Sequence, residues 1–445
     1  MPVFLPFRGV RYAPARERNL TAVVAPPYDI LSKEDVELLY RRSEHNIIRI
    51  DLGIAGAPGG EGWHEEAGRR FAAWRETGVL QTDERPAFYV LRQAYSLAGG
   101  ERRELVGIVG ACRLTPWEEG EVLPHEHTFA KPKEDRLKLM RCTGANLSQV
   151  YAFYSDPEKT VERLVQPELE RAPDAFAVDD DGGLHELWVL DDPERQAGIT
   201  RALAARPAFI ADGHHRYETA LAYRDERRGA QGDDPDAGWN FVMMFLVNVE
   251  SGGVTILPTH RLITSAPVPS AEVVAEALAP WYAVTELRLD ASEGIARAGR
   301  EVTESSGRIA IYLGDRWLWL DPKDRDRIAG AIDGNLSPEV RRLTVTALHH
   351  IVLPRAFGID RESVSAGGAV EYLRDAKAGT DRVDSGSARA LVYLPAPGPK
   401  DVLEVAKARD VMPHKSTYFY PKLLTGLVMK DLSLRVGPPG AGGRE

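Results

Sequence analysis

The residues best suited to chemistry stand together in the segment Asp212–Arg216, which reads Asp-Gly-His-His-Arg. The short apolar run 207–211 precedes it and 217–228 has helix composition, so a turn from a buried strand into a helix is predicted. A glycine permits close backbone approach and an unusual φ. The first N–H groups of the helix have no partners within it and face an anion. The segment therefore predicts a phosphate-binding active-site turn.

Each residue of this turn has a predicted role. Asp212, at the exit of the strand, can hold Mg²⁺ or accept a proton. Gly213 and Arg216 are expected to contact phosphate, the arginine with both of its terminal nitrogens. His214 and His215 are catalytic candidates that can donate protons. The structural alternative makes Asp212 a helix N-cap and the histidines ordinary surface groups, but their combination directly after a buried strand favours function.

A second polar cluster lies upstream at His125, Glu126 and His127, followed by a strongly basic stretch. The histidine spacing suggests a metal, but no third ligand is near, so zinc is not expected. The basic residues include Lys133 and Arg136. They form either a solvated helix face or a cationic lid over a nucleotide.

Three further segments are candidates for the site. His260 ends a predicted strand and is either structural or directed into the same cleft. Lys415, Ser416 and Thr417, with Lys422 after them, lie in a stretch of proline, aromatics and lysines with no clean period, which is typical of an ordered functional loop. We expect that loop to fold over the cleft and to help bind the cofactor. The turn 26–29 is either a connection or a substrate contact.

Composition narrows the class of protein. The chain has 445 residues, a net charge of −10 and two cysteines, Cys112 and Cys142, outside any zinc spacing. This indicates a cytoplasmic enzyme of two or three domains that keeps its thiols reduced. The acidic balance argues against a nucleic-acid partner, and no apolar run is long enough to cross a membrane. P-loop, Rossmann and α/β-hydrolase motifs are missing from the sequence.

Hydrophobic patterning predicts an α/β (α+β) protein in three regions. Residues 1–115 are expected to be an N-terminal α/β region, 116–263 the catalytic core, 264–436 a C-terminal α/β region, and 437–445 a disordered tail. Ser32 and Asp35 predict a capping box at the start of a helix. Ile47–Leu52 predicts a strand.

The segment around the turn resembles the family catalogued as domain of unknown function 1015. Similar segments cover nearly the whole chain: Ala25–Leu31, His125–Glu126 with Lys133–Arg136, Ala211–Ala220, Leu257–Arg261, and Met412–Thr417 with Pro421–Lys422. The family name itself implies no activity.

The turn is also similar to the ParB/sulfiredoxin-like nucleotide-binding fold, which implies such a core with N-terminal and C-terminal α/β extensions. Sulfiredoxins carry a reactive cysteine where this chain has His214, so their chemistry is not expected. Within the fold the turn most resembles that of free-serine kinases. Their Pro-His-Glu element matches Pro124–Glu126, which implies that Glu126 is the base for the acceptor hydroxyl.

The resemblance implies a Mg²⁺-dependent phosphotransferase that uses ATP or ADP, with free L-serine as the first acceptor to consider. The partners would then be a nucleotide and a small amino acid or hydroxy metabolite. Two alternatives stay open: a phosphatase with His214 or His215 as proton donor, and a non-catalytic nucleotide-binding switch. A homodimer is open as well.

Overall fold

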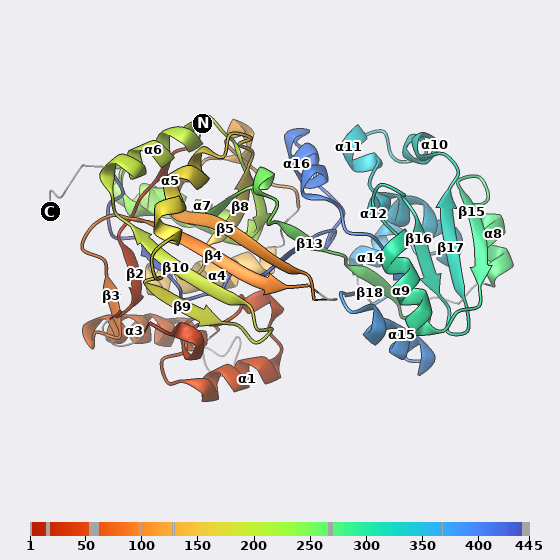
Figure 1. The fold of residues 1–445 in the computed structure, drawn as a ribbon, viewed down its shortest axis with the longest axis horizontal. Coiled ribbons are helices and arrows are strands. Elements are labelled where there is room, and N and C mark those ends of the chain that lie inside the picture. Colours follow the sequence, from red (N-terminus) through yellow and green to blue (C-terminus); the bar gives the residue numbers. More distant parts are fainter. Residues whose placement is uncertain are drawn as a thin grey trace. The chain divides into compact units, whose positions relative to one another are not determined.

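The computed structural model describes residues 2–14, 18–52, 62–97, 100–126, 128, 130–265, 270–366 and 368–437. His127 and residues 438–445 of the predicted tail lie outside these ranges. The chain divides into two compact units. The first contains Met1–Val254 and Pro421–Glu445, and the second contains Thr255–Tyr420. Figure 1 shows that both units combine helices with sheets, so the predicted mixed α/β class is confirmed.

Among the described residues, the main sheet of the first unit has nine strands. In sheet order they are β6 (Val122–Leu123), β11 (Ala208–Asp212), β8 (Val150–Tyr154), β12 (Phe241–Asn248), β5 (Arg102–Arg113), β4 (Phe88–Ser96), β10 (Leu184–Leu190) and β9 (Ala175–Val178), with β1 (Phe4–Leu5) on β5. Two neighbouring pairs are parallel, β6 with β11 and β8 with β12. The parallel pair β6–β11 matters most for function, because parallel strands end at the same edge of a sheet.

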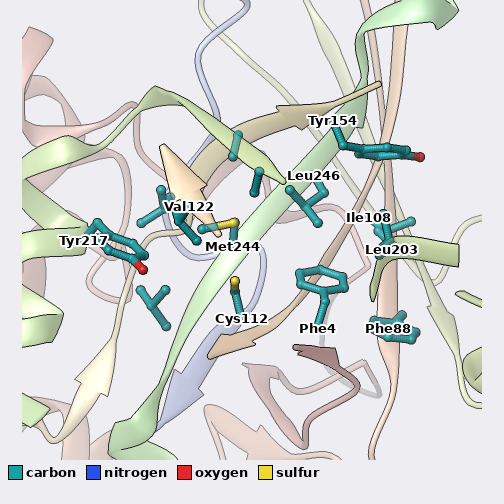
Figure 2. Packing of buried hydrophobic residues seen from close by; sticks show 14 of the residues in the cluster. Phe4, Phe88, Ile108, Cys112, Val122, Tyr154, Leu203, Tyr217, Met244 and Leu246 are labelled. Carbon is teal, nitrogen blue, oxygen red and sulfur yellow. The ribbon is translucent and has the colours of Figure 1, made fainter. Parts of the chain in front are cut away.

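The helices of the first unit pack on this sheet and around it. They are α1 (Lys33–Arg42), α2 (Ile48–Asp51), α3 (Trp63–Glu76), α4 (Ala130–Thr143), α5 (Thr160–Leu169), α6 (Pro193–Ala204) and α7 (His214–Gln231). Short 3₁₀ turns occur at Leu20–Ala22, Tyr28–Ile30, Trp117–Glu119, Gly238–Asn240 and Val249–Ser251. Buried side chains of α5, α6 and α7 meet those of the central strands in one hydrophobic cluster, part of which is drawn in Figure 2.

A smaller sheet of the first unit gathers distant segments. Its order is β3 (Leu80–Thr82), β2 (Gly9–Tyr12), β21 (Met429–Asp431) and β7 (Ala145–Asn146). Because β21 pairs with both β2 and β7, the C-terminal segment returns to the first unit. Lys422 therefore belongs to the unit that holds the Asp212–Arg216 turn.

The second unit is built on an antiparallel sheet. Its described strands, in order, are β15 (Tyr282–Leu287), β17 (Trp317–Pro322), β16 (Ile309–Tyr312), β19 (Ala390–Tyr393), β14 (His260–Ile263) and β18 (Val370–Leu373), and β13 (Thr255–Leu257) pairs separately with β20 (Tyr418–Tyr420). Its helices are α8 (Ala271–Leu278), α9 (Ala291–Glu301), α10 (Arg325–Gly330), α11 (Pro338–Arg341), α12 (Thr344–Ala347), a π-helix (Leu348–Val352), α13 (Leu353–Phe357), α14 (Arg361–Ala366), α15 (Ala376–Asp384) and α16 (Pro399–Lys407). Trp317 and Trp319 lie in its core.

Local predictions met different outcomes. The capping box of Ser32 and Asp35 is confirmed at the start of α1. The predicted strand Ile47–Leu52 is wrong, since Ile48–Asp51 forms helix α2. A short apolar run does not distinguish a buried strand from a buried helical turn. Here the side chain of Asn46 accepts from the N–H of Ile48 and so supports the start of the helical turn.

The two compact units have other boundaries than the regions predicted from the sequence. Residue 115 lies within the first unit, because β5 before it pairs with β12 after it. The first crossing between units falls between Val254 and Thr255 rather than at residue 263. Within the described ranges, no helix combines the length and the apolar character needed to span a membrane.

Tyr217, the first large residue after the turn, anchors α7 in the core. Its ring is fully buried and stacks on Trp117, with 4.5 Å between ring centroids. Its hydroxyl donates to the carbonyl of Thr115 at 2.9 Å and accepts from the N–H of the same residue at 3.1 Å. Figure 2 shows the ring among core side chains, so this residue of the motif positions the turn from within.

We expect Tyr217→Phe to lower the free energy of unfolding by about 1–3 kcal/mol, because two buried backbone groups of Thr115 lose their partner. Urea unfolding measures the change. Tyr40→Phe is the control, since no hydrogen bond of the Tyr40 hydroxyl occurs within the described residues, and it should change stability by less than about 0.5 kcal/mol. Equal stability of Tyr217→Phe and the wild type would contradict the anchoring role.

Candidate functional site

The predicted strand–glycine–helix turn is confirmed. Strand β11 ends at Asp212, Gly213 has a φ of 96°, and α7 begins at His214. A Cβ added at Gly213 would lie 2.9 Å from Nε of Arg216. The turn therefore needs glycine at this position for two reasons. The backbone is left-handed, and the arginine side chain folds back over the position where a Cβ would lie.

Asp212 stands between two cations. Its Oδ2 accepts from Nη2 of Arg216 at 2.6 Å, and its Oδ1 accepts from Nζ of Lys422 at 3.1 Å. Burial by itself would raise the pKa of Asp212, but Lys422 and Arg216 outweigh it and hold that pKa well below its ordinary value. The three side chains are 22%, 12% and 13% exposed, so the ionised group lies near the surface without being open to bulk water.

Within this trio two cations share one carboxylate, and Asp29 and Asp51 also act electrostatically on Arg216. Arg216 is also fixed by a hydrogen bond from Nη1 to the carbonyl of Gln149, at the start of β8. Cations that are held in place can bind an incoming anion without large rearrangement. The trio and the N–H groups at the start of α7 thus form a place where a phosphate fits.

Strand β6 brings His125 and Glu126 to the same turn. Because β6 runs parallel to β11, the residues that follow both strands meet at one edge of the sheet. His125 contacts the carbonyl of Ile210 through Nδ1 at 2.7 Å, and its backbone N–H donates to Nε2 of His214 at 3.2 Å. Glu126 is half-buried, and its negative charge acts to raise the pKa of His125, His214 and His215.

The hydrogen bonds fix the tautomers of two histidines. The carbonyl of Ile210 only accepts, so Nδ1 of His125 carries its proton. Nε2 of His214 accepts from a backbone N–H, so its proton is on Nδ1. Burial, together with the neighbouring His125, lowers the pKa of His214 to about 3, and burial lowers the pKa of His125 as well. Both rings are neutral near pH 7.

His215 differs from these two. It is half-buried, and burial lowers its pKa while Glu126 and Glu218 act in the opposite direction. A histidine with less burial beside two carboxylates is better placed to exchange protons than the locked His214.

The turn 26–29 lies at the same site. Desolvation and the negative charge of Asp212 raise the pKa of Asp29, while Arg216 and Lys422 lower it. The Tyr28 ring lies under the guanidinium of Arg136, 4.2 Å from its Cζ. Burial raises the pKa of Tyr28 to about 12, so the phenol stays protonated.

Helix α4 contributes two predicted residues, both of which are in ion pairs. Nζ of Lys133 lies 2.6 Å from Oε2 of Glu218, which also accepts from the hydroxyl of Thr128 at 2.5 Å. Arg136 is buried and pairs with Asp51 and Asp135. The basic stretch is thus partly a structural connection between α4 and α7 and not simply a solvated face.

Four predicted cofactor-binding residues lie in the second unit. His260 is buried, stacks on Tyr393 and accepts from the N–H of Leu394 at 3.2 Å. Burial and the adjacent Arg261 lower its pKa to about 3.

Of the other three, Lys415 is exposed and its Nζ lies 5.1 Å from the Tyr372 ring centroid. Ser416 is buried and donates to the carbonyl of Pro413, and Thr417 is half-buried. Ligand contact by these four residues stays a prediction.

Three residues around the turn were missed. Glu218 binds Lys133, and its position four residues after His214, on the same helix face, was a signal that spacing could have given. Gln149 and Asp51 come from segments with no motif, and only the tertiary structure brings them to Arg216 and Arg136.

A metal cage is not apparent in the part of the chain that the structure describes. No three potential ligands from His, Cys, Asp and Glu gather there. Mg²⁺ commonly takes only one or two protein carboxylates and completes its shell with phosphates and water. Asp212 would supply one such carboxylate, and both of its oxygens already accept hydrogen bonds from Arg216 and Lys422.

Comparison with known proteins gives a family and several similar folds. A family model described as protein of unknown function, DUF1015, matches residues 4–346. No curated protein matches the chain.

Solved structures of three proteins are among those similar to it. One variant of a free serine kinase, in complex with AMP and with ADP, shares 14% identity, with 69% of this chain and 89% of that chain covered and a TM-score of 0.33. A conserved hypothetical protein from Pyrococcus furiosus has 13% identity, 69% and 92% coverage and a TM-score of 0.31. SbnI with a C-terminal truncation, from Staphylococcus aureus, has 11% identity, 71% and 87% coverage and a TM-score of 0.32.

Gly213→Ala should destabilise the protein by about 1–2 kcal/mol, since alanine is strained at a φ of 96°, and should also displace Arg216. The matched control is Gly229→Ala in the same helix, where an added Cβ meets nothing within 4 Å. That substitution should stabilise by up to about 1 kcal/mol. Thermal unfolding of both variants checks the pair. A Gly213→Ala protein as stable as Gly229→Ala would contradict the need for glycine at the turn.

The buried neutral His214 predicts a pH-dependent stability. Its pKa of about 3 in the folded protein lies below the ordinary value of about 6.5. Between these values the unfolded chain binds more protons, so the contribution is fully present above about pH 6.5 and is lost as the pH falls towards 3. His214→Gln, which keeps an acceptor for the N–H of His125, should flatten the dependence by up to about 1.4 kcal/mol per pH unit. Urea unfolding between pH 4.5 and 7.5 tests this, and parallel curves for both proteins would refute it.

Proposed function

This chain belongs to the DUF1015 family of proteins of unknown function, and we propose that it is a phosphotransferase that moves a nucleotide phosphate to a small hydroxylated metabolite. The observation that carries the proposal is the cation pair Arg216 and Lys422, held on Asp212 at a turn whose histidines interact electrostatically with Glu126. A cation pair that is held in place suits a phosphate, and a carboxylate at the same turn suits a hydroxyl that must lose a proton.

Phosphate binding is assigned to the turn itself. Arg216 and Lys422 contact the terminal phosphate, and the N–H groups at the start of α7 complete its hydrogen bonds. Asp212 keeps both cations in position when no nucleotide is present. When the phosphate binds, its oxygens accept hydrogen bonds from Arg216 and Lys422, which also keep their contacts with Asp212. The phosphate therefore displaces solvent and does not have to displace the Asp212 carboxylate.

Proton removal is assigned to Glu126. The acceptor hydroxyl gives its proton to the Glu126 carboxylate while its oxygen forms a bond to the terminal phosphorus. The bond from that phosphorus to the bridging oxygen breaks, and the leaving nucleotide keeps the electron pair. Arg216 and Lys422 stabilise the negative charge that spreads over the transferred group.

Magnesium completes the proposal. Asp212 would hold Mg²⁺ together with the phosphates, and the ion would neutralise phosphate charge. ATP and ADP are both candidate donors. Free L-serine is the first acceptor to test, because the Pro124–Glu126 and Asp212–Arg216 segments resemble those of free-serine kinases.

The histidines bear on the phosphatase alternative. A phosphatase would need an imidazolium as proton donor, and His214 is neutral with Nε2 already accepting a hydrogen bond. His215 alone has the exposure for that role. The transferase is therefore the better supported function.

Purified protein should convert L-serine to O-phosphoserine with ATP or ADP and Mg²⁺, as followed by mass spectrometry. Glu126→Gln should lower kcat by about 10²–10⁴-fold, the usual contribution of a general base, while nucleotide still raises the melting temperature. Arg216→Ala should lose that thermal shift. Arg141→Ala, at an exposed ion pair with Glu226 on the same unit, is the matched control and should behave like the wild type.

Other results would choose between the alternatives. Nucleotide binding without any phosphorylated product would favour the non-catalytic switch. Phosphate released from phosphoserine in the absence of nucleotide would favour the phosphatase. A wild-type protein that neither binds nucleotide nor forms product would refute the phosphotransferase.

A further inference from the structure

Helix α7 holds the segment that carries Glu126 on both sides of that residue. Before Glu126, the backbone N–H of His125 donates to Nε2 of His214 at 3.2 Å. After Glu126, the hydroxyl of Thr128 donates to Oε2 of Glu218 at 2.5 Å. Glu126 thus lies between two neighbours that are each bonded to a side chain of the same helix.

The two side chains that bind this segment lie on one face of α7. His214 and Glu218 are four positions apart in the helix, so they follow one another on the same side, about 6 Å apart along the axis. His125 and Thr128, only three positions apart, are therefore bonded to successive turns of α7. The segment between them cannot shift along the helix without breaking one of these hydrogen bonds.

Glu218 is itself held in place by its neighbours. Nζ of Lys133 lies 2.6 Å from the same Oε2, and Nε1 of Trp117 donates to Oε1 at 3.4 Å. The Trp117 ring stacks on Tyr217, which anchors α7 in the core. Burial acts to raise the pKa of Glu218, but hydrogen bonds from Lys133 and Thr128 outweigh it and keep that pKa below its ordinary value. The carboxylate is therefore ionised near pH 7 and suited to accept from Thr128.

A second ion pair between α4 and α7 provides a comparison. Arg141 of α4 pairs with Glu226 of α7 at 2.5 Å, and their side chains are 48% and 42% exposed. Among the described residues, Glu226 forms hydrogen bonds with Arg141 alone. Glu218 also pairs with a cation of α4, but it is only 24% exposed and binds Thr128 in addition. The bond to Thr128 therefore gives Glu218 a role beyond the connection of the two helices.

We propose that Glu218 is a positioning residue for Glu126, which it holds, through Thr128, where the acceptor hydroxyl gives up its proton. The inference rests on the proposed phosphotransferase, in which Glu126 is the base. A base acts only within hydrogen-bond reach of its proton, about 2.6–3.2 Å, and a displacement of about 1 Å can lower a rate roughly a hundredfold. Glu218 thus contributes to kcat through the position of Glu126 and not through contact with the nucleotide or the acceptor.

Substitution of Thr128 in the full-length protein tests the connection without a change to Glu218 or Lys133. Thr128→Val keeps the shape of the side chain but removes the hydroxyl, whereas Thr128→Ser keeps the hydroxyl. We expect Thr128→Val to lower kcat by about tenfold to a hundredfold, while nucleotide raises the melting temperature as in the wild type. Thr128→Ser should retain most of the wild-type kcat. Equal kcat values for Thr128→Val and the wild type would overturn the inference.

A double-mutant cycle with Glu126 tests Glu218 itself. Glu218→Ala should lower kcat about as much as Thr128→Val does, but it should have little further effect in Glu126→Gln, because that variant has no base left to position. A general structural defect would lower kcat by the same factor in both backgrounds, and that result would contradict the positioning role. Glu226→Gln is the matched control, since it removes the other carboxylate of α7 that pairs with α4, and it should match the wild type.

Amide hydrogen exchange separates this inference from the proposed function, because it does not require activity. The peptide that contains Glu126 should exchange faster in Glu218→Ala and in Thr128→Val than in the wild type, and at the wild-type rate in Glu226→Gln, as followed by mass spectrometry. If no acceptor is phosphorylated, the transferase fails, and faster exchange in the first two variants still supports the hold of Glu218 on this segment. Wild-type exchange in both variants would refute that hold, whether or not phosphoryl transfer occurs.

Discussion

The site depends on one ionic arrangement, the carboxylate of Asp212 between Arg216 and Lys422. These three residues come from the end of β11, the first turn of α7 and the C-terminal segment, and the Asp212 carboxylate joins these three elements. Because two cations share one carboxylate, the arrangement is stable without ligand and still attractive to an anion. The glycine turn, the returning C-terminal segment and the anchoring of Tyr217 all serve to keep these charges within contact.

Around this centre the ionisable side chains differ in how deeply they are buried. His125 and His214 are buried, neutral and fixed in single tautomers by backbone groups, so they act as rigid supports. Glu126 and His215 are only half-buried, and the proposed function assigns proton removal to Glu126. A site that must bind a highly charged ligand benefits from such neutral supports, because they add hydrogen bonds without adding repulsion.

The sequence was informative where the signal was local. The turn at Asp212–Arg216 follows from an apolar strand, a glycine and a helix, and the capping box at Ser32 from two residues three apart. The meeting of Glu126 with that turn depends on the parallel pairing of β6 with β11, which no local pattern encodes. The wrong strand prediction at Ile47–Leu52 has the same origin. A segment that is buried on all sides shows a similar run of apolar residues whether it forms a strand or a short helix. Asp51 could not be identified, because its partner Arg136 lies far away in the chain.

The order of the chain has a consequence for how the protein is made. The first unit is interrupted after Val254 and resumes at Pro421, so the entire second unit is synthesised before Lys422 and β21 exist. At a translation rate of about 5–20 residues per second this interval lasts roughly 10 to 30 seconds. During it the nascent first unit has Asp212 and Arg216 but neither the second cation nor the fourth segment of its small sheet. The anion site is therefore completed last on the ribosome, and a polypeptide that is cut short within its second unit carries no finished binding centre.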